Sequence, residues 1–288
     1  MPSIRFHIIL FSLFLLPKAY GEYVLEGTVN MSGSWQHQIF LATIDNLDDY
    51  YKADAAFTIN QAPIDENGYF KLVGDNLPEE KQFYRLYLIK EADSEFDVCL
   101  HVGGDNHNFV HLIMDNHTQI NIKADPNSFA PFGDYTITSD KENTLMKALN
   151  DLVYPAHSFY EIKFPSELKF SRDKLNRDLF KFADTCSSPL VALAAINNTD
   201  FENYIDVHQV EYEQVLEKMQ SILPNHDYTR NYFRKYKFFA DDWENEVSFP
   251  SILNLILGFV CLLLLLRILK LENQKPCLLY TSPSPRDS

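Results

Sequence analysis

The C-terminal part of the chain contains a long uncharged stretch, and no other feature of the sequence constrains the fold as strongly. Residues 249–266 carry no charged side chain and end in a run of leucines at 262–266. As a helix with Arg267 reaching outward, this stretch covers about 30 Å at about 1.5 Å per residue, which matches the hydrocarbon core of a bilayer. A buried helix of a soluble protein is the weaker interpretation, because leucine covers every face and leaves no polar stripe. The sequence therefore predicts a transmembrane helix over 249–270, with Phe249, Leu257, Leu262, Leu266 and Arg267 among its residues.

Charged residues on the two sides of this helix predict its orientation. Four acidic residues lie within 241–246, whereas Arg267, Lys270 and Lys275 lie at or beyond the other end. The basic flank of a membrane span stays in the cytoplasm. We therefore expect the region before the helix to face away from the cytoplasm, and residues 271–288 to form a cytoplasmic stub.

The N-terminal residues have the pattern of a secretory signal peptide. Basic Arg5 precedes an apolar run at 8–16, Pro17 ends the run, and the small residues Ala19 and Gly21 follow at the positions that a signal peptidase reads. An uncleaved anchor is the weaker interpretation, because the apolar run is short for a span. The sequence predicts a signal peptide over 1–21, cleaved after Gly21.

The region between these two apolar segments is acidic. The chain holds 40 Asp and Glu against 25 Lys and Arg, a formal net charge of −15, and several of the basic residues flank the apolar segments. Such a region does not attract nucleic acid, which binds basic surfaces. Its charge is most simply a solvated surface.

Two of the four cysteines lie in this outer region, Cys99 and Cys186. Cys261 falls within the predicted span and Cys277 beyond it. Cys99 and Cys186 either pair or stay reduced, and the sequence leaves both alternatives open. Neither belongs to a C-x-x-C motif, so the usual group for thiol-redox chemistry is missing.

Residues 22–138 alternate apolar and polar side chains with the period of two that is typical of strands. The turn at Asp65-Glu66-Asn67-Gly68 carries Asn-Gly, which favours a tight hairpin. Short antiparallel strands at this spacing predict a β-sandwich. The expected strands are 23–30, 38–45, 56–60, 69–73, 83–89, 109–114, 118–122 and 135–138.

From residue 139 the apolar residues recur with helical spacing, so 139–248 is predicted to be α-helical. Ser139 opens a capping box that ends at Glu142, Ser171 is a candidate cap for a second helix, and Ser188-Pro189 favours the start of a third. Two more helices are expected, ending at Pro224 and near Phe239. The predicted fold class is α+β: an antiparallel β-sandwich, an α-helical segment and one transmembrane helix.

Four histidines, at positions 101, 107, 111 and 117, surround one predicted strand and are the strongest hint of a metal site. His107 and His111 lie on one face of that strand but about 13 Å apart at about 3.3 Å per residue, too far to share an ion unaided. They are weak metal candidates, and ordinary histidine is the simpler interpretation. Proton sensing by the same residues is open.

A search for other chemistry finds no catalytic constellation. The acidic residues at 45, 48, 49 and 54 lack the regular spacing and glycine of a calcium loop, so solvated charge is the better interpretation. Nucleophile elbows, phosphate-binding glycine loops and zinc-protease helices do not occur. We expect no enzyme activity, no cofactor and no organised metal site.

Several segments resemble a bacterial β-rich domain of unknown function: Ile64 through Phe70, Phe83 through Tyr87, and Gly103-Gly104 through Met114. In that family the domain often precedes a thioredoxin-like domain in exported thiol-disulfide interchange proteins, joined by a helical segment similar to Ser188 through Leu193. The resemblance covers about 23–196. It implies a fold and supplies no catalytic residues.

A span stands where the thioredoxin-like domain of that family begins, and this arrangement is similar to single-pass bacterial regulators with a cytoplasmic LuxR-type helix-turn-helix. Residues 277–288 resemble translated sequencing-adapter read-through. We therefore expect the natural protein to continue past about Lys275. This tail is therefore not expected to belong to the natural fold.

Together these features predict the periplasmic sensing or interaction half of an inner-membrane signalling protein, a transcriptional regulator whose DNA-binding domain is missing by truncation. The expected partners are an unknown extracytoplasmic ligand or protein and the membrane, with nucleic acid bound only through the missing domain and a homodimer left open. The alternative is a non-catalytic, membrane-anchored accessory of an exported thiol-disulfide interchange system. A eukaryotic type I receptor, suggested by glycosylation sequons such as Asn116-His117-Thr118, fits the bacterial resemblance less well.

Overall fold

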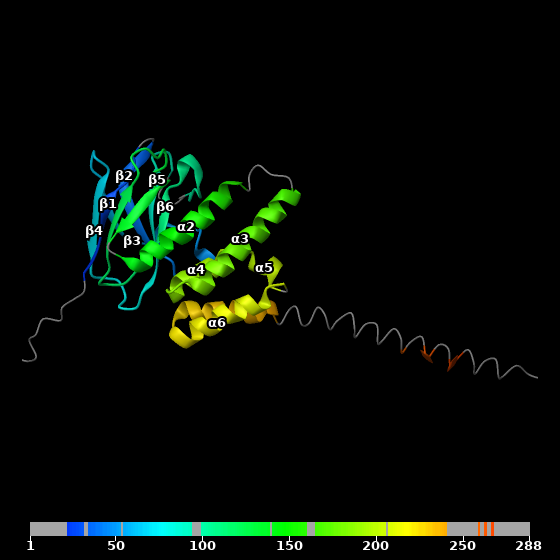
Figure 1. Ribbon diagram of the computed structural model, residues 1–288. Helices are drawn as coiled ribbons and strands as arrows, with labels where there is room; N and C mark the ends of the chain where they lie inside the picture. The colour runs from blue at the N-terminus through cyan, green and yellow to red at the C-terminus, as the bar shows by residue number, and fades with distance from the viewer. Residues whose placement is uncertain are drawn as a thin grey trace, which may run out of the picture. The chain divides into compact units, whose positions relative to one another are not determined.

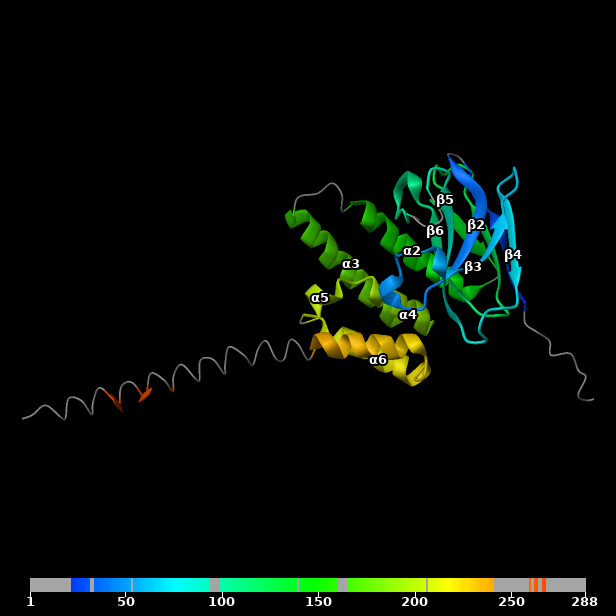
Figure 2. The same cartoon turned by 180° about the vertical axis from the view of Figure 1, so that it is seen from behind.

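The computed structural model describes residues 22–31, 34–52, 54–93, 99–138, 140–159, 165–205 and 207–240, together with 259, 262, 263, 266 and 267. The chain divides into two units, Met1–Arg234 and Lys235–Ser288. The first unit holds two sheets and the helices α2 to α6, and these helices all lie on one side of the sheets (Figures 1 and 2).

Eight strands form the two sheets, four in each. The first sheet has the order β4-β1-β7-β8, and the second, called sheet B below, has the order β3-β2-β5-β6. All pairings are antiparallel except that of β1 with β7, which is parallel. The strands are β1 Tyr23–Thr28, β2 Trp35–Thr43, β3 Thr58–Pro63, β4 Tyr69–Gly74, β5 Gln82–Lys90, β6 Phe109–Met114, β7 Gln119–Ala124 and β8 Tyr135–Thr138.

The two sheets pack face to face around one apolar core. Leu25 and Ile122 from the first sheet share this core with Leu41, Leu86 and Leu112 of sheet B. Alternation along each strand sends every second side chain inward, as the period-two pattern predicts. The predicted β-sandwich is therefore confirmed, with one parallel strand pair among antiparallel ones.

The predicted turn at Asp65–Gly68 forms, but it does not make a hairpin within one sheet. Gly68 has φ of 79°, and a Cβ there would meet the carbonyl oxygen of Val29 at 2.2 Å, so only glycine fits. The turn joins β3 of sheet B to β4 of the other sheet. The hairpin prediction was wrong because Asn-Gly specifies a tight reversal and does not specify which strands pair.

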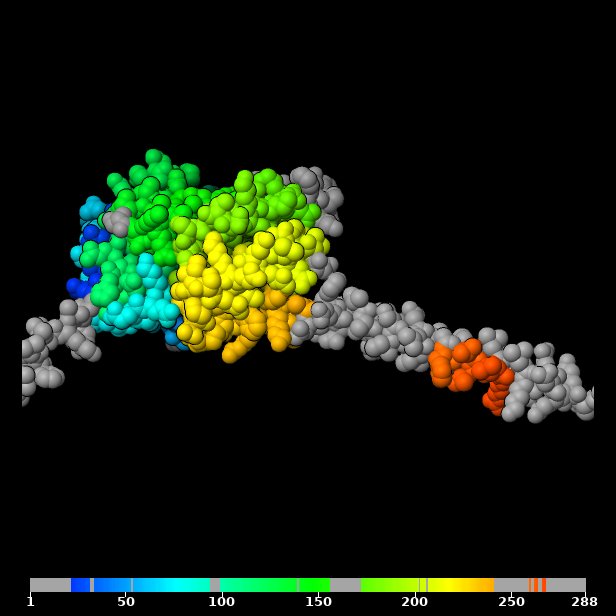
Figure 3. All heavy atoms as spheres, turned by 60° about the horizontal axis from the view of Figure 1, so that its bottom comes forward, coloured from blue at the N-terminus to red at the C-terminus, as the bar shows by residue number. Residues whose placement is uncertain are grey.

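The second half of the first unit is helical, as predicted. Its helices are α2 Lys141–Phe159, α3 Pro165–Thr185, α4 Pro189–Asn197, α5 Phe201–Tyr204 and α6 Gln209–Ile222. A further helix over 227–240 begins in this unit, which ends at Arg234. In Figure 3 the surfaces of α3 and α6 lie side by side on one face of the molecule.

The predicted helix starts were right once and wrong once. Ser188 caps α4, because its side chain accepts a hydrogen bond from the Val191 N–H at 3.3 Å. The second helix begins at Pro165, so Ser171 lies within it and does not cap it. At α2 the side chain of Asp140 accepts from the Asn143 N–H at 2.7 Å, and the predicted cap Ser139 lies outside the described residues.

The predicted transmembrane helix falls mostly outside the described residues. Five of its positions are described, Phe259, Leu262, Leu263, Leu266 and Arg267, and all five are helical and exposed. Phe249 and Leu257 lie outside, as do Ala19, Gly21 and the rest of the predicted signal peptide. Across the described part of the chain, no helix has both the length and the apolar character needed to cross a membrane. The structure thus supports the α+β part of the predicted fold class and gives no support to its membrane helix.

Candidate functional site

The outer face of sheet B is the most unusual surface in the fold, because it is buried although it faces away from the sandwich core. On β5, Tyr84, Leu86 and Leu88 point into the core, so Phe83, Arg85 and Tyr87 lie on the opposite face. All residues from Phe83 to Ile89 are nevertheless buried. The helical segment covers this second face, and α2 makes the contacts with β6.

Asn143 of α2 closes the edge of sheet B. Its side-chain oxygen accepts from the Ile113 N–H at 2.8 Å, and its side-chain NH₂ donates to the Ile113 carbonyl at 2.8 Å. These two bonds reproduce the pairing that a neighbouring strand would make with β6. Asn143 is fully buried. The amide therefore fixes α2 on the sheet and satisfies an edge that would otherwise be open.

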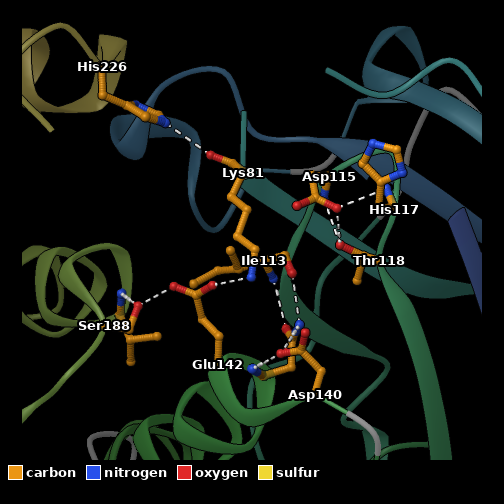
Figure 4. Close-up of polar contacts among 11 residues, drawn as sticks. Lys81, Ile113, Asp115, His117, Thr118, Asp140, Glu142, Ser188 and His226 are labelled. Carbon is orange, nitrogen blue, oxygen red and sulfur yellow. Dashed lines mark hydrogen bonds and ion pairs between the residues drawn. The ribbon is translucent and has the colours of Figure 1, made fainter. Parts of the chain in front are cut away.

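Lys81, just ahead of β5, lies where three helix starts meet (Figure 4). Its ammonium group pairs with the Glu142 carboxylate of α2 at 2.7 Å. Glu142 also accepts from the hydroxyl of Ser188, the cap of α4. The Lys81 carbonyl accepts from His226 at 3.0 Å, immediately before the helix at 227–240. We call these four residues the Lys81 junction.

Electrostatics favour the charged pair within this junction. Burial alone lowers the pKa of Lys81, but the hydrogen bond and charge of Glu142 outweigh it, so the pKa of Lys81 is raised overall. His226 is buried. Its Nδ1 accepts from the Tyr228 N–H at 3.3 Å, so Nε2 carries the proton and donates to the Lys81 carbonyl.

Tyr228 is inserted into the hydrogen-bond ladder of sheet B. Ile44 and Phe83 continue the β2–β5 pairing, because the Ile44 N–H donates to the Phe83 carbonyl at 3.0 Å. The return bond is missing, and the Tyr228 hydroxyl takes its place. It accepts from the Phe83 N–H at 3.2 Å and donates to the Ile44 carbonyl. The helix that leads toward the predicted span is thus held by the end of the sheet itself.

A second polar group lies under α2, formed by Tyr50, Arg85, His107, His111 and Tyr154. We call it the Arg85–His111 cluster. Arg85 is 1% exposed and donates to the carbonyls of Lys52, Asp49 and Tyr50, the last two at 2.9 and 2.6 Å. His111 lies opposite Arg85 in the β5–β6 register. Burial lowers the pKa of Arg85 to about 10, so its side chain stays charged at neutral pH.

The histidines of this cluster are buried and neutral. His111 contacts the Tyr50 carbonyl through Nε2 at 2.8 Å, and its ring lies 3.8 Å from the Tyr50 ring. His107 contacts the His101 carbonyl through Nδ1 at 3.0 Å. Burial, together with the charge of Arg85, holds the pKa of His111 well below its usual range, and burial lowers that of His107 to about 4.

The weak metal candidates His107 and His111 are therefore core residues, buried between sheet B and the helical segment that covers its outer face. The Phe109 ring lies between theirs, with ring centroids 4.8 Å from His107 and 5.1 Å from His111. His117 instead pairs with Glu79 at 2.8 Å on the surface. Among the described residues no three His, Cys, Asp or Glu side chains gather closely enough to hold a metal ion.

Residues of the predicted acidic loop contribute to structure. Asp54 accepts from the Ala56 N–H at 2.8 Å and caps a 3₁₀ turn at Ala55–Phe57. Asp49 pairs with Lys52 at 2.7 Å, within the 46–52 segment that Arg85 holds. Cys99 and Cys186 are both unpaired in the described structure, one exposed and the other buried.

Searches against protein-family models, curated proteins and solved structures found no match for this chain. The resemblance to an exported bacterial β-rich domain thus stays a prediction.

Three residues central to this site had not been singled out from the sequence: Arg85, Asn143 and Tyr228. A charge at position 85, within the otherwise uncharged Phe83–Ile89 run, is a local signal that could have been noticed. Asn143 and Tyr228 carry no such signal, because their partners are backbone groups 30 and 145 residues away in sequence.

Proposed function

We propose that this chain is the extracytoplasmic sensing or interaction part of a single-pass membrane signalling protein, with its output in the cytoplasm. In this proposal the ectodomain performs no chemistry. It changes conformation, and the helix at 227–240 passes that change to the predicted span at 249–270. The output is DNA binding by a domain encoded after about Lys275.

The insertion of Tyr228 into sheet B is the observation that carries the proposal. A hydroxyl that bridges Ile44 and Phe83 responds to any change in how the ends of β2 and β5 approach each other. The Lys81 junction adds a second link, through His226. These contacts join the start of the helix at 227–240 directly to the sheet.

Thermodynamics sets the condition for such a signal. A ligand or partner shifts the conformation only by the difference between its affinities for two states of the ectodomain. Moving an equilibrium from 1:99 to 99:1 takes about 10⁴-fold preference. A weaker preference, of about 10- to 100-fold, gives a graded response.

The test is a transcription reporter in cells that carry the natural gene, sequenced through the region after Lys275. Tyr228→Phe keeps the aromatic ring and removes only the bridging hydroxyl. We expect it to change the basal output, the response, or both. Transcription is measured at equal membrane abundance of each variant.

Tyr69→Phe is the matched control, because Tyr69 is 41% exposed and its hydroxyl donates to a surface carboxylate, that of Glu26, at 3.3 Å. It should behave as the unmodified protein. A Tyr228→Phe variant with unmodified output would count against transmission through this helix. A gene that ends naturally near Lys275 would remove the regulator proposal.

A further inference from the structure

We propose that the Arg85–His111 cluster makes the ectodomain respond to acid: a proton taken up by His111 places two cations side by side under α2, and segment 46–52 leaves the face of sheet B. This inference rests on the proposed sensing function and names its signal as the proton concentration outside the membrane. The regulated element is the loop that follows β2.

Arg85 and His111 hold segment 46–52 on sheet B, while Asn197 and Asn198 at the end of α4 bind the Leu47 carbonyl and the Tyr51 hydroxyl from the other side. Arg85 donates to three of its carbonyls, those of Asp49, Tyr50 and Lys52. His111 binds the Tyr50 carbonyl as well, at 2.8 Å. The Tyr50 carbonyl thus accepts hydrogen bonds from both Arg85 and His111. The Tyr50 ring packs on the His111 imidazole, with the ring centroids 3.8 Å apart.

The second proton has a defined place to bind. Since Nε2 of His111 faces a carbonyl and donates to it, the neutral ring leaves Nδ1 unprotonated. Nδ1 lies 3.5 Å from the Tyr154 hydroxyl. Protonation there turns His111 into an imidazolium directly across the β5–β6 ladder from Arg85, at the spacing of cross-strand partners.

Groups that surround His111 do not offset this charge. Arg85 faces it from β5, Tyr50 and Tyr51 from the 46–52 segment, Tyr154 from α2, and His107 from ahead of β6. Burial raises the pKa of each of these three tyrosines, so they stay neutral. Asp49 acts on Arg85 from the loop, but its carboxylate pairs with Lys52.

The direction of the pH effect follows from the histidines. In the closed state the pKa of His111 lies well below its usual range and that of His107 is about 4, whereas an exposed histidine has a pKa of about 6.5. The neutral form is the one that the closed state favours. The closed state is therefore fully stable above about pH 6.5 and loses stability as the pH falls toward 4.

Three buried polar atoms of the cluster already favour opening. Tyr50 Oη, Arg85 Nε and His107 Nε2 have no hydrogen-bond partner among the described residues. Buried groups without partners cost free energy, which is recovered when water reaches them. The closed cluster thus carries an existing free-energy cost, to which a charge on His111 adds.

The loop is connected to the proposed output path. Segment 46–52 follows Ile44 with one residue between them, and the Ile44 carbonyl is one of the two partners of the Tyr228 hydroxyl. Release of the segment frees the end of β2 that Tyr228 bridges. Acid can in this way reach the helix at 227–240.

The test is hydrogen exchange, measured by mass spectrometry on the full chain in detergent micelles from about pH 7.5 to about pH 4.5, on both sides of the ordinary histidine pKa. Rates are corrected for the intrinsic pH dependence of exchange. As the pH falls, we expect the opening constant of segment 46–52 to rise by about tenfold per pH unit for each proton taken up on opening. Strand β4 should stay protected from exchange over the same pH range. A corrected opening constant that does not change with pH overturns the proposal without any variant.

His111→Gln keeps a donor for the Tyr50 carbonyl and cannot be protonated. It should therefore remove the contribution of one proton, so that the logarithm of the opening constant rises by about one unit less per pH unit than in the unmodified chain. His117→Gln is the matched control at an exposed histidine that contacts Glu79, and it should keep the slope of the unmodified chain. A His111→Gln slope equal to that of the unmodified chain overturns the proposal.

Residues 227–234, followed in the same samples, separate this inference from the proposed function. If segment 46–52 opens in acid and 227–234 opens with it, both are supported. If the segment opens and 227–234 does not, the acid response stands and the proposed transmission fails. If the segment stays closed, the acid response fails whatever 227–234 does.

Discussion

Replacing Asn143 with leucine removes both hydrogen bonds that close the edge of β6 and leaves a side chain of similar size. Each bond is 2.8 Å long and joins fully buried groups, so the variant leaves the Ile113 N–H and carbonyl without partners. An unsatisfied buried backbone group costs about 1–3 kcal/mol. Two such groups give a loss of about 2–6 kcal/mol in the free energy of unfolding, which the extra apolar contact of leucine offsets only in part.

Denaturant unfolding of the full chain in detergent, followed by circular dichroism, measures this loss. For a domain of about 200 residues it corresponds to a fall of about 4–24 °C in Tm. Asn203→Leu is the control, since that exposed side chain bonds to Asp200 at 2.8 Å, and it should change stability by less than about 0.5 kcal/mol. If both variants lose equally little, Asn143 does not pair with the strand edge and the docking of α2 needs another explanation.

Three further predictions follow from the geometry. Glu142→Gln removes the partly exposed pair with Lys81 and should cost about 0.5–1 kcal/mol by denaturant unfolding, more than the same change at exposed Glu79. Arg85→Lys loses the planar guanidinium that donates to three carbonyls at once. Hydrogen exchange in segment 46–52 should therefore rise about 10- to 100-fold at neutral pH, and unchanged exchange would contradict the role of Arg85. In intact cells a membrane-impermeant maleimide should label the exposed Cys99. The variant Cys99→Ser should not be labelled until the membrane is opened. Labelling of that variant in intact cells would contradict the proposed topology.

Much of the β-sandwich was predictable because its strands are short, alternating and separated by strong turns. The predicted strands at 109–114 and 135–138 match β6 and β8 residue for residue. Pairing was less accessible. Nothing local in β1 or β7 indicates that they run parallel, and the Asn-Gly turn before Gly68 does not show that it crosses between sheets.

The buried contacts on the outer face of sheet B could not be predicted from the sequence, because they join residues that lie far apart along the chain. His107 and His111 stood out as a metal hint, yet their burial comes from α2 and from segment 46–52, which no periodicity connects to β6. Arg85 was visible only as a charge in an apolar strand. Helix starts were predictable where a single cap acts, as at Ser188, and not at α3, whose first residue is Pro165.

Hydrogen exchange of residues 227–234 in Tyr228→Phe tests most directly whether sheet B holds the helix ahead of the predicted span. Losing the bridging hydroxyl leaves the buried Phe83 N–H and the Ile44 carbonyl without partners, each at a cost of about 1–3 kcal/mol. We predict that opening of 227–234 becomes at least about 30-fold more frequent in Tyr228→Phe and stays unchanged in Tyr69→Phe. Equal exchange in the two variants would contradict the account, because the helix would then not be held by the ladder between Ile44 and Phe83.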